Sequence, residues 1–447
     1  MRSQQYIVRF TFGFITFILS ADAAFATQNT SDVPQKTLDK QDKPKPDDSD
    51  AERPKKPAPK PTTRKTYTRA QLLARTRMLA DSRMPNMWGD FFDGTPYPLN
   101  FNDRTVFPPD WNVNGEGGTG GTITTGPGGS GGGGSALPPP PPRIPRAGGL
   151  ASRRVKLSEN NSPIPTDRWI LNHNYFNDVE RIGDATRYTF GFEKTFAEGL
   201  KSFEVRFSFA NTLSNAQIFN GTLNTVSQIR SDEAGNLVLN YKSVIWGLDD
   251  GVITAGMGVA LPTADDQFLF NPSGQLLMKF HNDAAHLMPF IAFVRMPTDK
   301  LFIQGYAQAD FASSANPALA LTSNGAPGLS PIAKIKDVPL LFLDIAFAYK
   351  WIEDREGWIN AVTPLLELHY SMGMGRQDRL RFHPSSPLND AFDLGGPDRI
   401  SVLNLTAGAS LQIGDSIFVR PAVSIPLTNG AGASYDYEFG VHVNILR

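Results

Sequence analysis

The chain has 447 residues, no cysteine and a formal net charge of -1 at pH 7. The lack of cysteine excludes disulfides and thiolate metal sites, and the near-neutral charge balance gives no indication of a nucleic-acid partner. Its 40 glycines and 35 prolines are unevenly placed, so part of the chain is not packed structure, although the remainder is long enough for one large domain.

Residues 1–26 have the pattern of a secretory signal peptide. Arg2 is followed by a mostly apolar run from Tyr6 to Leu19, and Ala24-Phe25-Ala26 supplies a small-x-small cleavage site. The run is shorter than the ~20 apolar residues that a membrane-spanning helix needs. We therefore expect the mature chain to be exported.

Residues 27–66 are predicted to be a disordered tether, because this polar stretch, rich in Pro and Lys, cannot bury enough apolar surface to fold. Residues 112–165 are predicted to be a Gly- and Pro-rich linker. On this composition residues 27–150 as a whole are expected to be dispensable for the folded domain.

Residues 67–111 contain a short predicted helix and an aromatic cluster. Thr68 and Gln71 have capping-box spacing, and a group of Met, Trp and Phe residues follows the helix. Two interpretations remain open for this part. It is either a marginal helix packed on a neighbouring surface, or an interfacial anchor or plug that enters a barrel.

Residues 166–447 alternate apolar and polar residues in about twelve segments. A strand sends successive side chains to opposite faces, so each segment has one apolar and one polar face. In an outer-membrane barrel the apolar face meets lipid and the polar face lines the lumen. The segments are Trp169–Phe176, Arg187–Phe196, Ser202–Ala210, Leu237–Trp246, Val252–Leu261, Leu287–Met296, Leu301–Phe311, Leu341–Trp351, Trp358–Tyr370, Ile400–Ile413, Ser416–Leu427 and Tyr435–Ile445.

The lengths of the connections distinguish a barrel from a secreted β-sandwich. Short turns such as Asp249–Gly251 follow the even-numbered segments, whereas long links such as Pro262–Ala285 follow most of the odd-numbered ones. Outer-membrane barrels have short turns on the periplasmic side and long loops outside. We therefore predict an all-β fold: a closed antiparallel transmembrane barrel of about 12 strands in the bacterial outer membrane, with both termini periplasmic.

Several stretches of the barrel region resemble a known family. They are Tyr188–Phe196, Phe203–Arg206, Leu261–Thr263 and Leu403–Gly408. They are similar to porin-like outer-membrane proteins of planctomycete bacteria and, more distantly, to the transporter family named for the MetA pathway of phenol degradation. The resemblance covers about residues 165–447. It implies a barrel channel, with no catalytic residues to carry over.

Charged and polar residues fall on the expected lumen face. Neighbouring segments put Glu193 near Glu204 and Arg206, and the last two segments put Arg420 near Asp436 and Glu438. Two interpretations fit: an internal ion-pair network that rigidifies a narrow barrel, or a pore lining that sorts solutes by charge. The candidate lumen-lining residues are Glu193, Glu204, Arg206, Asp344, Glu367, His369, Arg420, Asp436, Glu438 and His442.

These features favour a porin-like channel or transporter for small solutes, not an enzyme. One alternative is a structural barrel that tethers the envelope through its Pro-rich arm. Another is a barrel lipid hydrolase, which would need a Ser–His pair near the membrane boundary. The six histidines lack metal-ligand spacing, so no metal, cofactor or catalytic residue is expected. The expected partners are outer-membrane lipid, small solutes and, through the N-terminal arm, the cell wall.

Epitope tags test the predicted topology. Tags at Ser273 or Asn324, in long links, should bind antibody on intact cells, because these links face outward. Tags at Asp250 or Asp299, in short turns, should bind only after the cells are permeabilised. Equal accessibility of both groups would contradict the assignment of long and short connections.

Overall fold

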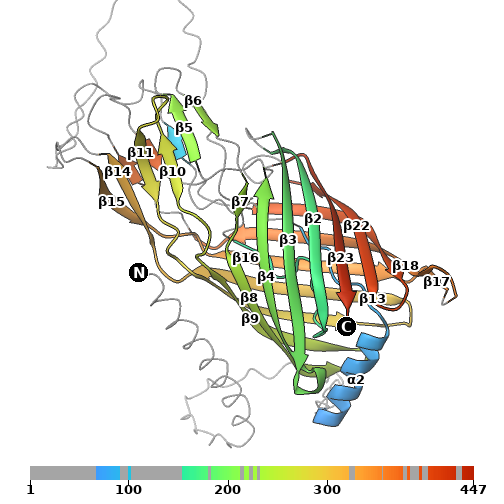
Figure 1. Ribbon diagram of the computed structural model, residues 1–447. Coiled ribbons are helices and arrows are strands. Elements are labelled where there is room, and N and C mark those ends of the chain that lie inside the picture. The colour runs from blue at the N-terminus through green and yellow to red at the C-terminus, as the bar shows by residue number, and fades with distance from the viewer. Residues whose placement is uncertain are drawn as a thin grey trace, which may run out of the picture. The chain divides into compact units, whose positions relative to one another are not determined.

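The structure is a computed structural model (Figure 1). It describes residues 67–90, 99–101, 154–179, 183–211, 216–220, 225–228, 232–321, 328–354, 356–375, 380–382, 392–394, 401–428 and 435–447. The predicted signal peptide and tether, and most of the predicted linker, lie outside the described residues. Within the described residues, no helix is long and apolar enough to cross a membrane.

Twelve antiparallel strands close into a barrel (Figure 1), which confirms the predicted fold class. Each barrel strand pairs with the barrel strands before and after it in the chain, and β2 pairs with β23, so the sheet has no free edge. The strands are β2 (Arg168–Val179), β3 (Gly183–Phe196), β4 (Lys201–Asn211), β8 (Leu237–Leu248), β9 (Gly251–Leu261), β12 (His286–Arg295), β13 (Leu301–Ala312), β16 (Leu340–Tyr349), β18 (Ile359–Gly373), β21 (Ser401–Ile413), β22 (Ile417–Pro426) and β23 (Tyr437–Leu446).

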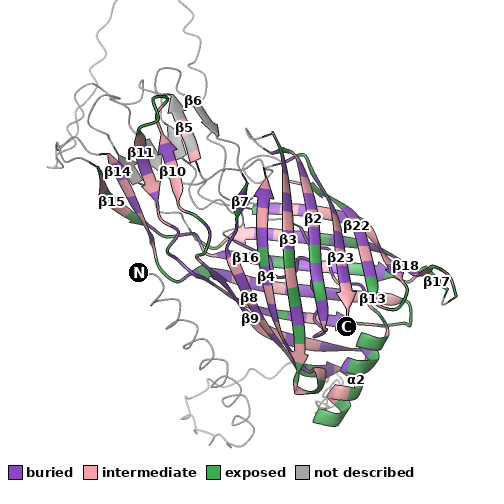
Figure 2. Cartoon of the chain, viewed as in Figure 1, coloured by how far each residue is buried: buried purple, intermediate pink, exposed green. Residues whose placement is uncertain are grey.

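Burial alternates along the barrel strands (Figure 2). In β4 the charged side chains of Glu204 and Arg206 are buried, whereas Phe207 between the buried positions is 40% exposed. Phe190 in β3 and Phe347 in β16 are likewise exposed. Apolar side chains on the outside and charged side chains inside are the reverse of a soluble protein and define a barrel of the outer-membrane type.

The turn between β16 and β18 carries two exposed tryptophans. It contains the short strand β17 (Ile352–Glu353), which pairs with β18. Trp351 and Trp358 flank it and are 67% and 77% exposed. Tryptophan is favoured where membrane meets water, so this turn marks one boundary of the apolar band.

The long links, which the sequence predicts only as loops, form a second, six-stranded sheet. Three links each contribute one antiparallel hairpin, and β5 pairs in parallel with β10. Alternation over such short segments is too brief to be recognised in the sequence. In sheet order the strands are β15 (Leu329–Ile335), β14 (Asn316–Leu321), β11 (Leu276–Phe280), β10 (Gln267–Phe270), β5 (Ala216–Asn220) and β6 (Thr225–Gln228).

Asp266, next to β10, is held by this second sheet. Burial alone would raise the pKa of Asp266, but hydrogen bonds from Lys279 and from the Asn282 N–H outweigh it and lower that pKa below its usual value. The remaining short strands are β7 (Glu233–Ala234), which pairs with β4, and a three-stranded sheet of β1 (Leu99–Phe101), β20 (Phe392–Leu394) and β19 (Leu380–Phe382).

Helix α2 (Arg69–Asp81) begins with the capping box expected from the sequence. The Thr68 Oγ1 accepts a hydrogen bond from the Gln71 N–H, and the Gln71 Oε1 accepts one from the Thr68 N–H. These two bonds satisfy backbone donors that the first helical turn leaves free.

The helix contacts the short-turn end of the barrel. The Tyr67 hydroxyl donates to Asp249 Oδ1 at 2.7 Å, and this bond raises the pKa of Tyr67. At the other end of the helix, Arg83 Nη2 lies 2.9 Å from Asp415 Oδ1 in the β21–β22 turn. The fully buried Leu79 packs with Val252 and other apolar residues of the barrel. Residues 67–83 therefore pack on the barrel and are not linker, and the expectation that the barrel folds without residues 27–150 stays a prediction.

Charge on the outer face should destabilise the barrel. Phe207→Arg places a guanidinium among lipid tails, which costs ~2–4 kcal/mol near the midplane. The expected result is a lower temperature for the loss of the compact, heat-modifiable band on gels after refolding into lipid. Phe207→Leu is the control and should behave like the wild type. An equal effect of both variants would contradict the assignment of this face to lipid.

Candidate functional site: the plugged lumen

Two segments of the chain, residues 84–90 and 154–167, lie inside the barrel, and together we call them the plug. They run antiparallel to each other: the Met87 N–H donates to Asn161 O at 2.8 Å, and the Asn160 N–H donates to Trp88 O at 3.0 Å. The predicted linker therefore ends earlier than expected, because residues 154–165 are buried in the lumen. Their polar composition suits a charged lumen as well as a linker.

The plug contacts the inner face of every barrel strand, which is possible only from within. On β12 the contact is apolar, and on the other strands it is a hydrogen bond or an ion pair. From β2 to β23 in chain order, the contacted wall residues are Asn172, Arg187, Arg206, Lys242, Thr254, Met288, Gln308, Asp344, Glu367, Asn404, Arg420 and Asn444.

Lys156 of the plug is bound between two carboxylates. Its Nζ lies 2.8 Å from Asp344 Oδ1 and also contacts Asp90, while His369 Nδ1 lies 2.9 Å from the same Asp344 oxygen. All four side chains are buried. Asp90, Asp344 and His369 offer three possible metal ligands close together. The Lys156 ammonium already supplies the positive charge there, so the cluster is best understood as an ion-pair lock between plug and wall.

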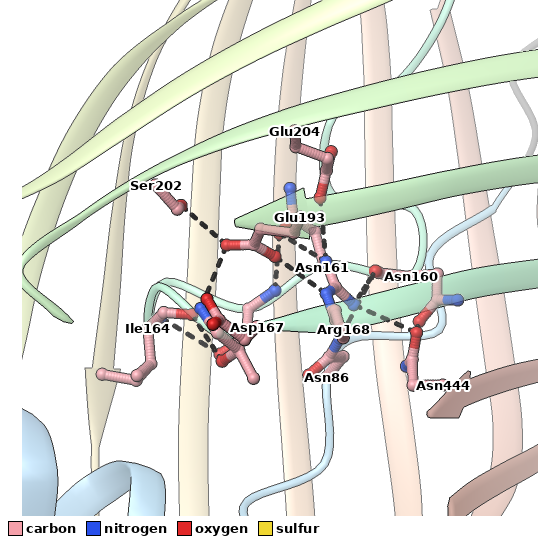
Figure 3. Close-up of polar contacts among 12 residues, drawn as sticks. Asn86, Asn160, Asn161, Ile164, Asp167, Arg168, Glu193, Ser202, Glu204 and Asn444 are labelled. Atoms are coloured by element: carbon pink, nitrogen blue, oxygen red, sulfur yellow. Dashed lines mark hydrogen bonds and ion pairs between the residues drawn. The ribbon is translucent and has the colours of Figure 1, made fainter. Parts of the chain in front are cut away.

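Arg168 organises a second buried cluster, at the start of β2 (Figure 3). Its Nε lies 2.8 Å from Glu193 Oε2, and its Nη2 lies 2.9 Å from Glu204 Oε2. Arg206 Nε and Lys242 Nζ bind the remaining carboxylate oxygens at 2.7 and 2.9 Å. The two carboxylates thus share three cations, and neither is left exposed to act as a free charge in a pore.

The plug also has a carboxylate, that of Glu159, which binds cations of the wall. Glu159 accepts a charged hydrogen bond from Arg187, and its backbone carbonyl accepts one from Arg206. The Asn172 side chain donates to Glu159 as well. Charge pairing therefore runs in both directions across the lumen, from plug cations to wall carboxylates and from wall cations to a plug carboxylate.

The Glu367 carboxylate binds the plug backbone. Its two oxygens accept hydrogen bonds from the Trp88 N–H at 2.7 Å and the Gly89 N–H at 2.9 Å. Gly89 has a φ of +82°, and a Cβ there would lie 2.5 Å from Glu159 Cα. Only glycine allows this conformation together with the close approach of the two plug segments.

The Trp88 ring packs against β23. It stacks on the His442 imidazole with 4.7 Å between the ring centroids. A Cβ on Gly440 would lie 2.5 Å from the indole, so glycine at this inward position makes room for it. On the opposite wall, Met87 and Leu157 pack with Met288 and other apolar residues.

The structure places nine of the ten predicted lumen residues in the buried interior; Asp436 is exposed. It lies just before β23, where its N–H donates to Asn177 O, and Tyr435 beside it is buried instead. Alternation of faces holds only within a strand, and β23 begins at Tyr437. The predicted outward orientation of Tyr435 and the predicted inward orientation of Asp436 are therefore both wrong. The expected pairing of Arg420 with Asp436 or Glu438 is also not formed. Arg420 is opposite His442 in the register, and Glu438 accepts from Asn174.

The sequence does not identify the plug residues as part of the lumen site, because their stretches have the composition of linkers. Arg154, for example, binds Asp310 at 2.9 Å and the Val338 carbonyl at 2.7 Å. The available signal was the Met and Trp cluster after α2, which had suggested a plug as one interpretation. In the described part of the chain, the buried histidines His286, His369 and His442 contact carboxylates or amides, and none is hydrogen-bonded to a serine.

No protein-family model matches the sequence, and a search of curated proteins finds no matching sequence. Solved structures with a similar fold include the NanC porin, at 9% identity and TM-score 0.35 over 62% of this chain and 100% of that one. An outer-membrane channel from Pseudomonas putida F1 has 9% identity and TM-score 0.40, over 64% and 97%. The Pseudomonas putida toluene transporter TodX has 10% identity and TM-score 0.34, over 67% and 91%. Likenesses this weak do not define a function.

Removing the Lys156 charge should destabilise the folded protein strongly. Lys156→Met leaves Asp90 and Asp344 buried without their ammonium, and breaking a buried pair this way costs about 3–5 kcal/mol. Lys194→Met is the matched control, because Lys194 pairs with Asp167 but is 71% exposed. Surface pairs of that kind contribute about 0–1 kcal/mol. Denaturant unfolding from lipid vesicles compares the two variants, and equal losses would contradict the buried lock.

Proposed function

We propose that this protein is a gated channel or transporter for small solutes in the bacterial outer membrane, and that the plug holds it closed. The observation that carries the proposal is the charged inner wall of the barrel, which is bound on every strand by two other segments of the same chain. Opening then means displacement of the plug, not the loss of any barrel strand.

The width of the lumen supports this proposal. A barrel of about 8 strands is filled by its own side chains, whereas about 16–18 strands leave an aqueous channel. This barrel has twelve strands and accommodates two chain segments side by side. If the plug leaves, the vacated space is wide enough for a small solute.

The chemistry of the wall supports it too. Buried ion pairs are costly to desolvate, and well-packed apolar residues often stabilise an interior equally well or better. A barrel selected only for rigidity has little need of Arg168, Glu193 and Glu204 inside it. A wall that meets water in an open state does need polar side chains, because water then solvates what the plug releases.

The all-round contact of the plug favours a second candidate, a structural barrel that never opens. In that case the lumen network serves only to rigidify, and the N-terminal arm tethers the envelope to the cell wall. With an even number of strands and α2 against the short turns, we place both ends of the chain in the periplasm. Conductance distinguishes the two candidates.

A reversible lock on the plug tests the gated channel. The chain has no cysteine, so Leu157→Cys with Gly258→Cys introduces a single possible disulfide. A Cβ on Gly258 would lie 2.7 Å from Leu157 Cδ1, so the pair is close enough to bridge plug and wall. In planar bilayers we expect the oxidised double variant to be silent. Reductant should restore the gating events that the wild type shows.

Each single cysteine variant is the control, and neither should respond to oxidation or reduction. Equal conductance of the oxidised and the reduced double variant would contradict the proposal, because ions would then pass without displacement of the plug. A wild type without any conductance, over a range of voltages, would favour the structural barrel.

A further inference from the structure

Arg420 differs from the other cations buried in the lumen. It is 1% exposed, its Nη1 donates to Asn86 O at 3.2 Å, and its Nε has no hydrogen-bond partner. No described carboxylate forms an ion pair with it: Glu367 attracts it electrostatically from farther away, but the two oxygens of that carboxylate bind the Trp88 and Gly89 N–H groups. The other lumen cations are each bonded to an Asp or Glu: Arg154, Lys156, Arg168, Arg187, Arg206 and Lys242.

A cavity of about 50 Å³ lies against Arg420, between α2, the plug, β22 and β23. A single water needs only about 10–15 Å³ on this measure, so the cavity has room for a small polyatomic ion. Its polar lining comes from Arg83, Asn86, Ser162, Thr166 and Asn444 besides Arg420, and none of the described lining residues is acidic.

The mouth of this cavity is accessible beside α2. Ala80 and Arg83 line it and are exposed, so a solute can reach it from the short-turn end of the barrel without displacing the plug. At the entrance the Arg83 guanidinium is paired with Asp415 at 2.9 Å. A small ion would therefore enter past this ion pair and bind at Arg420, which has no such partner.

We propose that Arg420 is the centre of a binding site for a small oxyanion of the size of sulfate or phosphate. A buried cation without a counterion is unfavourable, and an anion in the cavity would supply the missing charge. The planar guanidinium fork matches two oxygens of such an ion, with Nε as one of the available donors. The Ser162 hydroxyl, which accepts from the Ile164 N–H, can add a neutral donor, whereas the amides of Asn86 and Asn444 already donate to Asn160.

This site deepens the proposed function, because it names a class of solute, small oxyanions, that would bind at the short-turn end of the closed channel. Binding itself needs no conduction, so the two proposals can fail separately. A silent barrel that binds sulfate would retain the site. A conducting barrel that does not bind it would retain the channel and overturn the site.

Isothermal titration calorimetry with inorganic sulfate tests the site on the full-length protein in detergent micelles. Sodium gluconate keeps the ionic strength constant. We expect saturable binding to the wild type, at least tenfold weaker binding to Arg420→Gln, and partial recovery in Arg420→Lys. Arg295→Gln removes an exposed arginine at the same end of the barrel and should bind sulfate like the wild type.

A second variant protects the test if Arg420→Gln fails to fold, as judged by heat-modifiable gel mobility. Ala80→Phe keeps every charge and narrows the mouth of the cavity, so it should also weaken sulfate binding at least tenfold. No saturable binding to the wild type would overturn the proposal. So would equal binding to the wild type, Arg420→Gln and Ala80→Phe, because the ion would then bind elsewhere.

Discussion

The charge pairing between the plug and the barrel wall is the interaction on which the rest of the structure depends. Lys156 of the plug pairs with the wall carboxylate of Asp344, and Glu159 of the plug accepts a hydrogen bond from the wall cation Arg187. A buried charge is tolerated only when it is paired, so the plug sequence and the wall sequence require each other. This mutual requirement explains why a polar segment that resembles a linker folds inside the barrel, and why the wall can be charged although it is closed to water.

The outer face of the barrel requires apolar side chains, in contrast to the charged lumen. Lipid solvates apolar side chains and cannot satisfy backbone groups, so the sheet must close on itself and present residues such as Phe190 and Phe207. Tyr67, just before helix α2, binds the short turn at Asp249, and the chain after the helix leads directly into the plug. Movement of α2 would therefore act directly on the plug.

The barrel strands and the N-cap of α2 could be predicted because their signals are local. Alternation with a period of two sorted Glu204 and Phe207 correctly, and the spacing of Thr68 and Gln71 located the helix start. The rest depends on contacts between distant segments. Nothing near Lys156 in sequence indicates Asp344, 188 positions away. Tyr435 and Asp436 precede the first residue of β23, where the alternation does not apply, and no local residue marks the start of the strand.

The most direct measurement of the plug is amide hydrogen exchange, read by mass spectrometry on the full-length protein in lipid. The Met87, Trp88 and Gly89 N–H groups are bonded to Asn161 O and to Glu367, within the buried lumen. The account predicts that peptides covering these residues and Leu157 exchange as slowly as those from the barrel strands. Exchange within seconds, as in an unfolded linker, would contradict it.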